Sequence, residues 1–329
     1  MQKTVAAMIA CLAIALCAEG WAGAESRQWK IGHVRPSGSA IDTDVHRLVE
    51  RIATATNGAI VIEVYPGNKL GDYTVVQERV SVGDVEMFVG PFGSAIDKRL
   101  ALAFTPFWVL TWEEAKRVYA SDSLLFRQMA LFLEAKNIKL IGGWPVYFGG
   151  IALTRNPPYP GNPDISKEMI IRVPPVRCFE LTAKALGFTP YPITWTYAKM
   201  GLKTGMVQGI LGGGAEGYLG LTETIRYYLP VKDHFEYWFV YMNLNLWNGL
   251  PEGTKAVIAT AAQEMETGRW QVAEASERSA IEQLKKVRVE VIYLSAGEHA
   301  AMKAKVRKTV WPEMQKEIGE AFVRVTGGK

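Results

Sequence analysis

Strand and helix patterns alternate near the start of the chain, and this alternation determines the fold class. Residues 29–34, 59–65 and 85–89 carry short apolar runs typical of buried strands. Residues 41–55 lie between the first two runs with apolar side chains three and four apart, as in an amphipathic helix. Residues 72–82 form a second helix pattern that ends before a glycine. Strands joined in this way by helices predict an α/β fold with a parallel sheet covered by helices.

A second group of strand and helix patterns follows and predicts a second lobe. An aromatic turn is expected at residues 144–148, directly after one of the strands. The expected strands are 138–143, 151–154, 169–173 and 207–211, and the expected helices are 177–186 and 197–204. A chain of 329 residues also exceeds what one core comfortably fills, which favours two domains.

The last part of the sequence is mostly helical. Residues 252–284 predict a helix long enough to extend along both lobes. A short strand is expected at 287–293, followed by a helix over 297–322 that Pro312 should interrupt. We expect one lobe to comprise residues 25–150 and about 239–280, and the other residues 151–238 and about 281–329.

The first residues fit a secretory signal peptide. Lys3 precedes an apolar run over residues 5–17, and Ala22-Gly23-Ala24 forms a small-residue cleavage site. The apolar run is too short to span a membrane, which needs roughly 20 residues. We therefore expect residues 1–24 to be removed by cleavage near Ala24 and the rest of the chain to be secreted across the cytoplasmic membrane.

Charge and motif content favour a small-molecule binding protein. The net charge is +4 without a dense basic run, so no nucleic-acid partner is expected. The four histidines lack metal-ligand spacing, and neither a metal nor another cofactor is expected. Cys178, the one cysteine outside the signal peptide, is expected to be buried. No nucleophile motif is present, so we do not expect an enzyme.

Arg172 is the sharpest candidate for a binding residue. It lies in the apolar strand 169–173, directly before Pro174 and Pro175 at its end. Ligands of α/β proteins bind at the ends of such strands, and a guanidinium can hold a carboxylate through two hydrogen bonds. A structural ion pair with Glu168 or another carboxylate is the alternative interpretation.

Glycines and aromatic side chains near strand ends complete the predicted site. Residues 209–214 hold four glycines, which either let backbone N–H groups approach an anion or simply form a turn. Aromatic walls with a few polar groups are typical of small-molecule clefts, although each ring could instead belong to the core. Besides Arg172, the candidates are Phe92, Trp144, Tyr147, Phe148, Trp195, Gly212, Gly213, Glu216 and Tyr218.

Six segments spread along the chain resemble one known family in their order and spacing. They are NG with VYPGNKLG (57–71), VGDVEM (82–87), IRVP (171–174), LGFTP (186–190), KTGMVQG (203–209) and NLWNGLP (245–251). The family is that of the DctP-type substrate-binding proteins of tripartite ATP-independent periplasmic (TRAP) transporters. The resemblance implies a two-lobed periplasmic binding protein fold, with a mixed sheet flanked by helices in each lobe and a long helix shared by both. It also implies a periplasmic location and a small organic acid as ligand, with its carboxylate on Arg172. The implied partners are the small and large membrane subunits of the transporter.

Two departures from the family pattern indicate which kind of ligand to expect. Residues 210–213 lack an asparagine that many members carry there, and residues 148–151 lack an arginine. Both changes remove polar groups, so we expect one cation, Arg172, in an otherwise apolar cleft. The hypothesis is an aromatic or branched carboxylate, such as an indole or phenyl acid or its 2-oxo or amino form. A C4-dicarboxylate or sugar acid, or a role with an ATP-driven importer, is the alternative.

Overall fold

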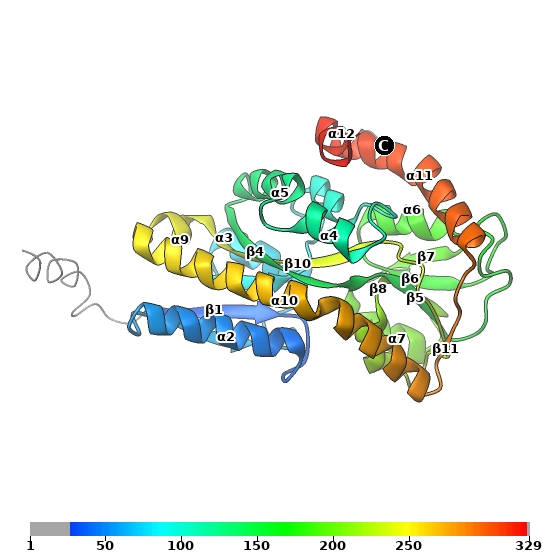
Figure 1. Ribbon diagram of the computed structural model, residues 1–329, viewed down its shortest axis with the longest axis horizontal. Helices are drawn as coiled ribbons and strands as arrows, with labels where there is room; N and C mark the ends of the chain where they lie inside the picture. Colours follow the sequence, from blue (N-terminus) through cyan, green and yellow to red (C-terminus); the bar gives the residue numbers. More distant parts are fainter. Residues whose placement is uncertain (1–26, 328–329) are drawn as a thin grey trace, which may run out of the picture.

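The computed structural model describes residues 27–327, which form two mixed β-sheets flanked by helices (Figure 1). The predicted α/β fold class is therefore confirmed. The predicted signal peptide, residues 1–24, lies outside the described residues. Within residues 27–327, no helix combines the length and the apolar character needed to cross a membrane.

The first five elements follow the predicted alternation of strands and helices. β1 (Arg27–His33) and β2 (Ile60–Tyr65) pair in parallel and are joined by α2 (Ala40–Ala55). α3 (Tyr73–Val82) then leads to β3 (Met87–Gly90), which pairs in parallel with the other edge of β1. The carboxyl ends of β1 and β3 therefore lie side by side.

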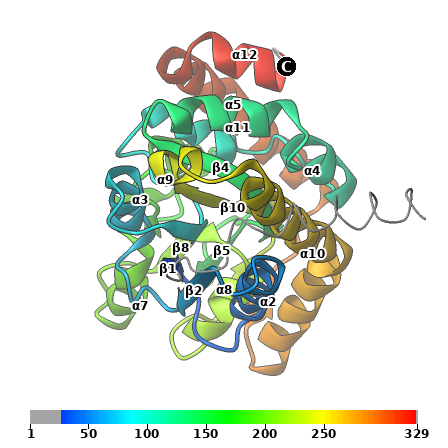
Figure 2. The same cartoon turned by 90° about the vertical axis from the view of Figure 1, so that its left-hand side faces the viewer.

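Two long antiparallel strands complete the first sheet, whose order is β2-β1-β3-β10-β4. β10 (Phe235–Asn243) lies between β3 and β4 (Ile138–Phe148), and all nine of its residues are buried. Successive side chains of β10 pack in different hydrophobic cores, one on each face of the sheet. Trp238 packs toward α2 and α10, whereas Phe239 packs toward α3 and α5. Figure 2 shows α2 and α5 on opposite sides of this sheet.

The predicted aromatic turn at residues 144–148 is wrong, because β4 continues as a strand through Phe148. In the pairing with β10, Tyr237 lies opposite Pro145 and Glu236 lies opposite Tyr147. The residue between Pro145 and Tyr147 thus has no partner, and this irregularity is a β-bulge. A bulge accommodates a proline that a regular ladder would exclude.

The second sheet has six strands, and the chain reaches it from β4 through Gly149. Its order is β11 (Glu290–Val291), β9 (Tyr227–Leu229), β5 (Gly150–Leu153), β8 (Gly209–Gly213), β6 (Ile170–Val173) and β7 (Thr189–Pro192). β6 is parallel to β7 and β8, whereas β5 is antiparallel to β8 and β9. The glycine-rich stretch expected after a strand is largely the strand β8 itself.

Shorter helices cover both sheets. α5 packs on β4, and α6 packs on β7 and on α11. Cys178 in α6 is buried, as predicted. The elements are η1 (Lys98–Phe104), α4 (Trp112–Tyr119), α5 (Leu124–Glu134), α6 (Arg177–Ala185), α7 (Trp195–Lys203), α8 (Ala215–Tyr218), η2 (Leu219–Leu221) and α9 (Leu244–Asn248).

The longest helix, α10 (Glu252–Lys286), extends past both sheets, as predicted (Figure 1). It packs on α2 and β4 of the first half and on α8 and β11 of the second. α11 (Ala296–Ile318) runs through Pro312, so the predicted interruption there is wrong. Pro312 is exposed, which lets water hydrate the carbonyl group that it leaves unpaired. The break comes instead at Gly319, where φ is 77°, and α12 (Glu320–Thr326) follows.

Candidate functional site

A cavity of about 550 Å³, counting its open mouth, lies between the two halves of the molecule. Residues after β1 and β3 and at the start of α3 form one wall. Residues of β6, the start of α6 and the start of α7 form the opposite wall, and β10 of the first sheet contributes Glu236 and Trp238. Strand ends from two sheets meet here, which is where α/β folds bind small molecules.

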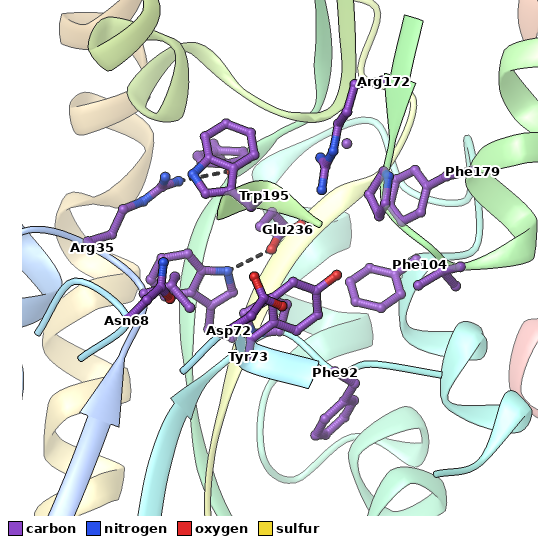
Figure 3. Close-up of a pocket in the computed structure, with 17 residues that line it drawn as sticks. Arg35, Asn68, Asp72, Tyr73, Phe92, Phe104, Arg172, Phe179, Trp195 and Glu236 are labelled. Atoms are coloured by element: carbon purple, nitrogen blue, oxygen red, sulfur yellow. Dashed lines mark hydrogen bonds between the residues drawn. The ribbon is translucent and has the colours of Figure 1, made fainter. Parts of the chain in front are cut away.

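Arg172 projects from β6 into this cavity (Figure 3). The residue is 1 % exposed, and its Nε donates a 2.7 Å hydrogen bond to the carbonyl oxygen of Ile193. Nη1 is buried without a hydrogen-bond partner, and no described carboxylate, Glu168 included, forms an ion pair with the guanidinium. Burial lowers the pKa of Arg172, yet an arginine remains protonated at physiological pH. The cavity therefore contains a buried cation with an unsatisfied nitrogen.

A second arginine faces Arg172 across the indole of Trp195. The Cζ of Arg35 lies 5.4 Å from the centre of this indole, and the Cζ of Arg172 lies 5.5 Å from it. Arg35 also lies 5.2 Å from the ring centre of Trp238 and donates a 3.2 Å hydrogen bond to the Tyr147 hydroxyl. Cation–π contacts at these distances stabilise both guanidinium groups at the indole.

Two carboxylates balance the two arginines on the cavity wall. Glu236 on β10 is 6 % exposed, and its Oε1 accepts a 2.6 Å hydrogen bond from Nε1 of Trp238. Asp72 caps α3, since its Oδ1 accepts a 3.3 Å hydrogen bond from the backbone N–H of Thr74. Asn68 lines the same side, and its Oδ1 is buried without a partner. This side of the cavity therefore carries acceptor groups.

Behind Glu236, the His234 imidazole lies between two acids. Its Nε2 is 3.1 Å from Oε2 of Glu236, and its Nδ1 is 2.7 Å from Oδ2 of Asp233. Burial alone would lower the pKa of His234, but the two carboxylates outweigh burial and raise the pKa to about 10. His234 is therefore protonated and buried at neutral pH. Its positive charge offsets that of Asp233, so the negative charge of Glu236 remains as the net charge of the cluster.

Aromatic rings form much of the remaining wall. Phe104 and Phe179 contact each other with ring centroids 5.5 Å apart. Phe92 stacks on Phe239 at 4.1 Å, and Tyr73 points its hydroxyl toward Arg172 (Figure 3). Walls of this kind suit the apolar body of a ligand.

Half of the site residues expected from the sequence line the cavity, and the other half lie elsewhere. Those on the cavity wall are Phe92, Tyr147, Arg172, Trp195 and Gly212. Those away from the wall are Trp144, Phe148, Gly213, Glu216 and Tyr218.

Trp144 and Phe148 lie in the core because β4 continues where a turn was expected. Trp144 stacks on Trp238 with centroids 5.4 Å apart, and its Nε1 donates a 2.8 Å hydrogen bond to Asp44. Phe148 packs edge-on against Phe235. The bulge in β4 leaves only Tyr147 of this segment on the cavity wall.

Glu216, Tyr218 and Gly213 take part in the packing of the second half. Glu216 lies 3.5 Å from Nη2 of Arg269 on α10. The Tyr218 hydroxyl donates a 2.8 Å hydrogen bond to the carbonyl oxygen of Gly150. A Cβ at Gly213 would lie 2.9 Å from the Tyr218 ring, so glycine permits this close packing.

Sequence reasoning missed four polar residues of the cavity: Arg35, Asn68, Asp72 and Glu236. The expectation of one cation in an otherwise apolar cleft is therefore wrong. Arg35 follows a predicted strand directly, so the strand-end rule that selected Phe92 could have selected it. Glu236 had no such signal, because its strand was not predicted.

Comparison with known proteins assigns the chain to a family. The family model for bacterial extracellular solute-binding proteins of family 7 (DctP) matches residues 31–317. The chain belongs to this family. It is 22 % identical to the C4-dicarboxylate-binding periplasmic protein DctP of Rhodobacter capsulatus, over 97 % of this chain and 95 % of the relative. It is 23 % identical to the sialic acid-binding periplasmic protein SiaP of Vibrio cholerae, over 80 % and 82 % of the two chains.

Solved structures of TRAP solute-binding proteins share the fold. One from Haemophilus influenzae with bound L-gulonate superimposes with a TM-score of 0.83 at 20 % identity, covering 92 % of this chain and 99 % of the other. One from Desulfovibrio salexigens with bound orotic acid gives 0.80 at 18 % identity, covering 91 % and 99 %. DctP-family proteins of TRAP transporters are transport proteins rather than enzymes, and they bind small organic acids and deliver them to membrane permease subunits.

Proposed function

We propose that this chain captures an aromatic or otherwise apolar carboxylate in the periplasm and holds it on Arg172. It then delivers the acid to the small and large membrane subunits of a TRAP transporter, with no catalytic step. The signal-peptide pattern over residues 1–24 and the periplasmic relatives support this location.

The proposal rests on Nη1 of Arg172, which is buried without a hydrogen-bond partner in the described part of the chain. A buried donor without a partner costs free energy, and a carboxylate that enters the cavity removes this cost. A guanidinium also matches a carboxylate in shape and charge. The ligand carboxylate is therefore placed against Arg172, beside the indole of Trp195.

The aromatic wall supports an apolar ligand body. One charged hydrogen bond contributes roughly 1.5–3 kcal/mol, whereas micromolar affinity requires about 8 kcal/mol in total. Contacts with rings such as Phe92, Phe104 and Phe179 must supply much of the difference. On the side opposite Arg172, a second carboxylate would meet Asp72 and Glu236, and Arg35 there is already in contact with two indoles and the Tyr147 hydroxyl. We therefore expect C4-dicarboxylates, which name one relative, to bind less well than apolar acids.

We place one lobe around each sheet, close to the boundaries expected from the sequence except that all of β10 belongs to the first lobe, and propose that the ligand stabilises their closed arrangement. Two hydrogen bonds across the gap support this view. The Ser94 hydroxyl donates to the carbonyl oxygen of Pro175 at 3.3 Å, and the Thr196 hydroxyl donates to Asp72 at 2.9 Å.

A ligand panel with matched variants tests the proposal. Aromatic and branched carboxylates, C4-dicarboxylates and sugar acids are compared first by thermal shift and then by calorimetry. We expect apolar acids to bind, and Arg172→Ala to weaken their binding by about 10- to 150-fold. Arg177→Ala, which removes an exposed arginine, should leave the affinity unchanged. Stabilisation by C4-dicarboxylates alone would contradict the apolar ligand, and full affinity in Arg172→Ala would contradict the role of Arg172.

A further inference from the structure

The charges that line the cavity sum to zero among the described residues. Arg35 and Arg172 supply two positive charges, and Asp72 and Glu236 supply two negative charges. The His234–Asp233 pair behind Glu236 adds no net charge. A ligand with a single negative charge would therefore leave the closed cavity with an uncompensated charge, which is costly in a buried site.

We propose that the ligand is a zwitterion, with a carboxylate on Arg172 and a positively charged nitrogen that contacts Glu236 and Asp72. The ligand class is an amino acid with an apolar side chain, or another apolar acid that carries an ammonium group. This inference rests on the proposed function, because it assigns the second polar group of the same ligand.

The arrangement of donors and acceptors supports this assignment. In Figure 3, the Arg172 guanidinium points toward Glu236, Asp72 and Tyr73 on the opposite side of the cavity. A ligand lying between them meets a donor at one end and acceptors at the other. Arg35 lies on the same wall as Asp72, but it contacts the indoles of Trp195 and Trp238 and donates to the Tyr147 hydroxyl. The Arg172 donor on one side and the Glu236 and Asp72 acceptors on the other fix the orientation of a zwitterion and disfavour a ligand that lacks one of its charges.

The acceptor side has spare hydrogen-bonding capacity. Each Glu236 oxygen accepts one hydrogen bond, from Trp238 or from His234, whereas a carboxylate can accept about four in all. Asn68 adds an Oδ1 that is buried without a partner. An ammonium group has three N–H donors and no acceptor, so it matches this side in number and in sign.

A charged nitrogen fits this side better than a hydroxyl group. A hydroxyl could donate one hydrogen bond to Glu236 or Asp72, but it would leave the ligand carboxylate as an excess charge in the cavity. A 2-oxo group, which only accepts hydrogen bonds, would place its oxygen against the two carboxylates. For a given side chain, we therefore expect the amino acid to bind most tightly, the hydroxy acid less tightly and the 2-oxo acid least tightly.

The test compares four head groups on one side chain. Phenylalanine, phenyllactate, phenylpyruvate and 3-phenylpropionate are titrated into the mature chain by calorimetry, and the same series is repeated with indole and isobutyl side chains. We expect the amino acid of the best-bound series to bind at least tenfold more tightly than its three analogues. Equal or tighter binding of an analogue that lacks the nitrogen would overturn the zwitterion and leave the proposed function standing. If no carboxylate of any series binds, the proposed function itself fails.

Two variants assign the preference to its residues. Asp72→Asn keeps a side chain that caps helices well, and Glu236→Gln keeps the size of the side chain. We expect each variant to reduce the preference for the amino acid over 3-phenylpropionate, or over the matching deamino acid of the best-bound series. Glu264→Gln removes an acid that pairs with Arg51 away from the cavity and should leave this preference unchanged. A preference that survives both cavity variants would overturn the assignment to Asp72 and Glu236.

Discussion

The hydroxyl of Thr196 donates a 2.9 Å hydrogen bond to Oδ2 of Asp72, and this bond joins the start of α7 to the start of α3. The two helices belong to different halves of the molecule, so the bond forms only when the halves are close together. Asp72 also lines the cavity. The same carboxylate thus contacts the opposite half and faces the space that a ligand would fill, so we expect ligand binding to favour the arrangement in which the two halves are close together.

Thr196→Val should weaken ligand binding by removing this contact while keeping the shape of the side chain. A hydrogen bond to a charged group contributes about 1.5–3 kcal/mol when buried, and less at this exposed position. We expect a loss of affinity of about 2- to 10-fold, measured by calorimetry with the best ligand of the panel. Thr204→Val is the matched control, because the Thr204 hydroxyl bonds within its own helix, to Met200. An unchanged affinity in Thr196→Val would show that this hydrogen bond does not stabilise the ligand-bound form.

The His234 cluster makes stability depend on pH. The pKa of His234 is about 10 in the folded protein against 6.5 for an ordinary histidine, so the folded state binds the proton more tightly. The resulting stabilisation is complete below pH 6.5 and is lost as the pH rises toward 10. We expect the stability difference between the wild type and His234→Gln to shrink by up to about 1.4 kcal/mol per pH unit in this range. Urea titrations from pH 6 to pH 9.5 measure it, and a constant difference would contradict a protonated His234.

Glu277 of α10 stabilises the end of β4. Its Oε1 accepts a 2.8 Å hydrogen bond from the backbone N–H of Phe148, and its Oε2 accepts a 3.1 Å hydrogen bond from Nε1 of Trp112. Glu277→Leu would leave both donors without an acceptor, and each costs about 1–3 kcal/mol when buried. We expect a lower free energy of unfolding in urea, with a smaller loss in Glu277→Gln. Glu274→Gln, on the exposed face of the same helix, should show little change. Wild-type stability in Glu277→Leu would mean that the buried charge costs as much as its hydrogen bonds contribute.

Local patterns predicted the elements that have one solvent-facing side. α2 shows this clearly, because its buried residues recur with helical spacing and its other face is polar. β10 was missed for the opposite reason. All nine of its residues are buried, so the alternation that marks a half-exposed strand is absent. Pro145 likewise indicated a turn, because nothing local shows that a bulge opposite Tyr237 accommodates it.

The residues of the candidate site differ in the same way. The position of Arg172 on the cavity wall could be predicted, since a cation in an apolar strand that ends at two prolines is unusual by itself. Glu236 could not, because it reaches the cavity only through the pairing of β10 with β3 and β4. Asp72 was placed at the start of a helix, but only the tertiary fold brings it within hydrogen-bond distance of Thr196. Residues that depend on contacts between distant segments leave no local pattern.

Gly212 on the cavity wall should tolerate no side chain. Its φ is 86°, a left-handed conformation that costs other residues about 1–2 kcal/mol. A Cβ there would also lie 2.4 Å from the Pro174 ring, at the end of the strand that carries Arg172. Gly212→Ala should therefore lower the free energy of unfolding in urea and, by displacing Pro174, weaken ligand binding in calorimetry. Gly220→Ala is the control, because Gly220 is exposed with no heavy atom within 4 Å of its Cβ position and its backbone is not left-handed. Full stability with reduced affinity in Gly212→Ala would show that the glycine serves the ligand directly rather than the packing against Pro174.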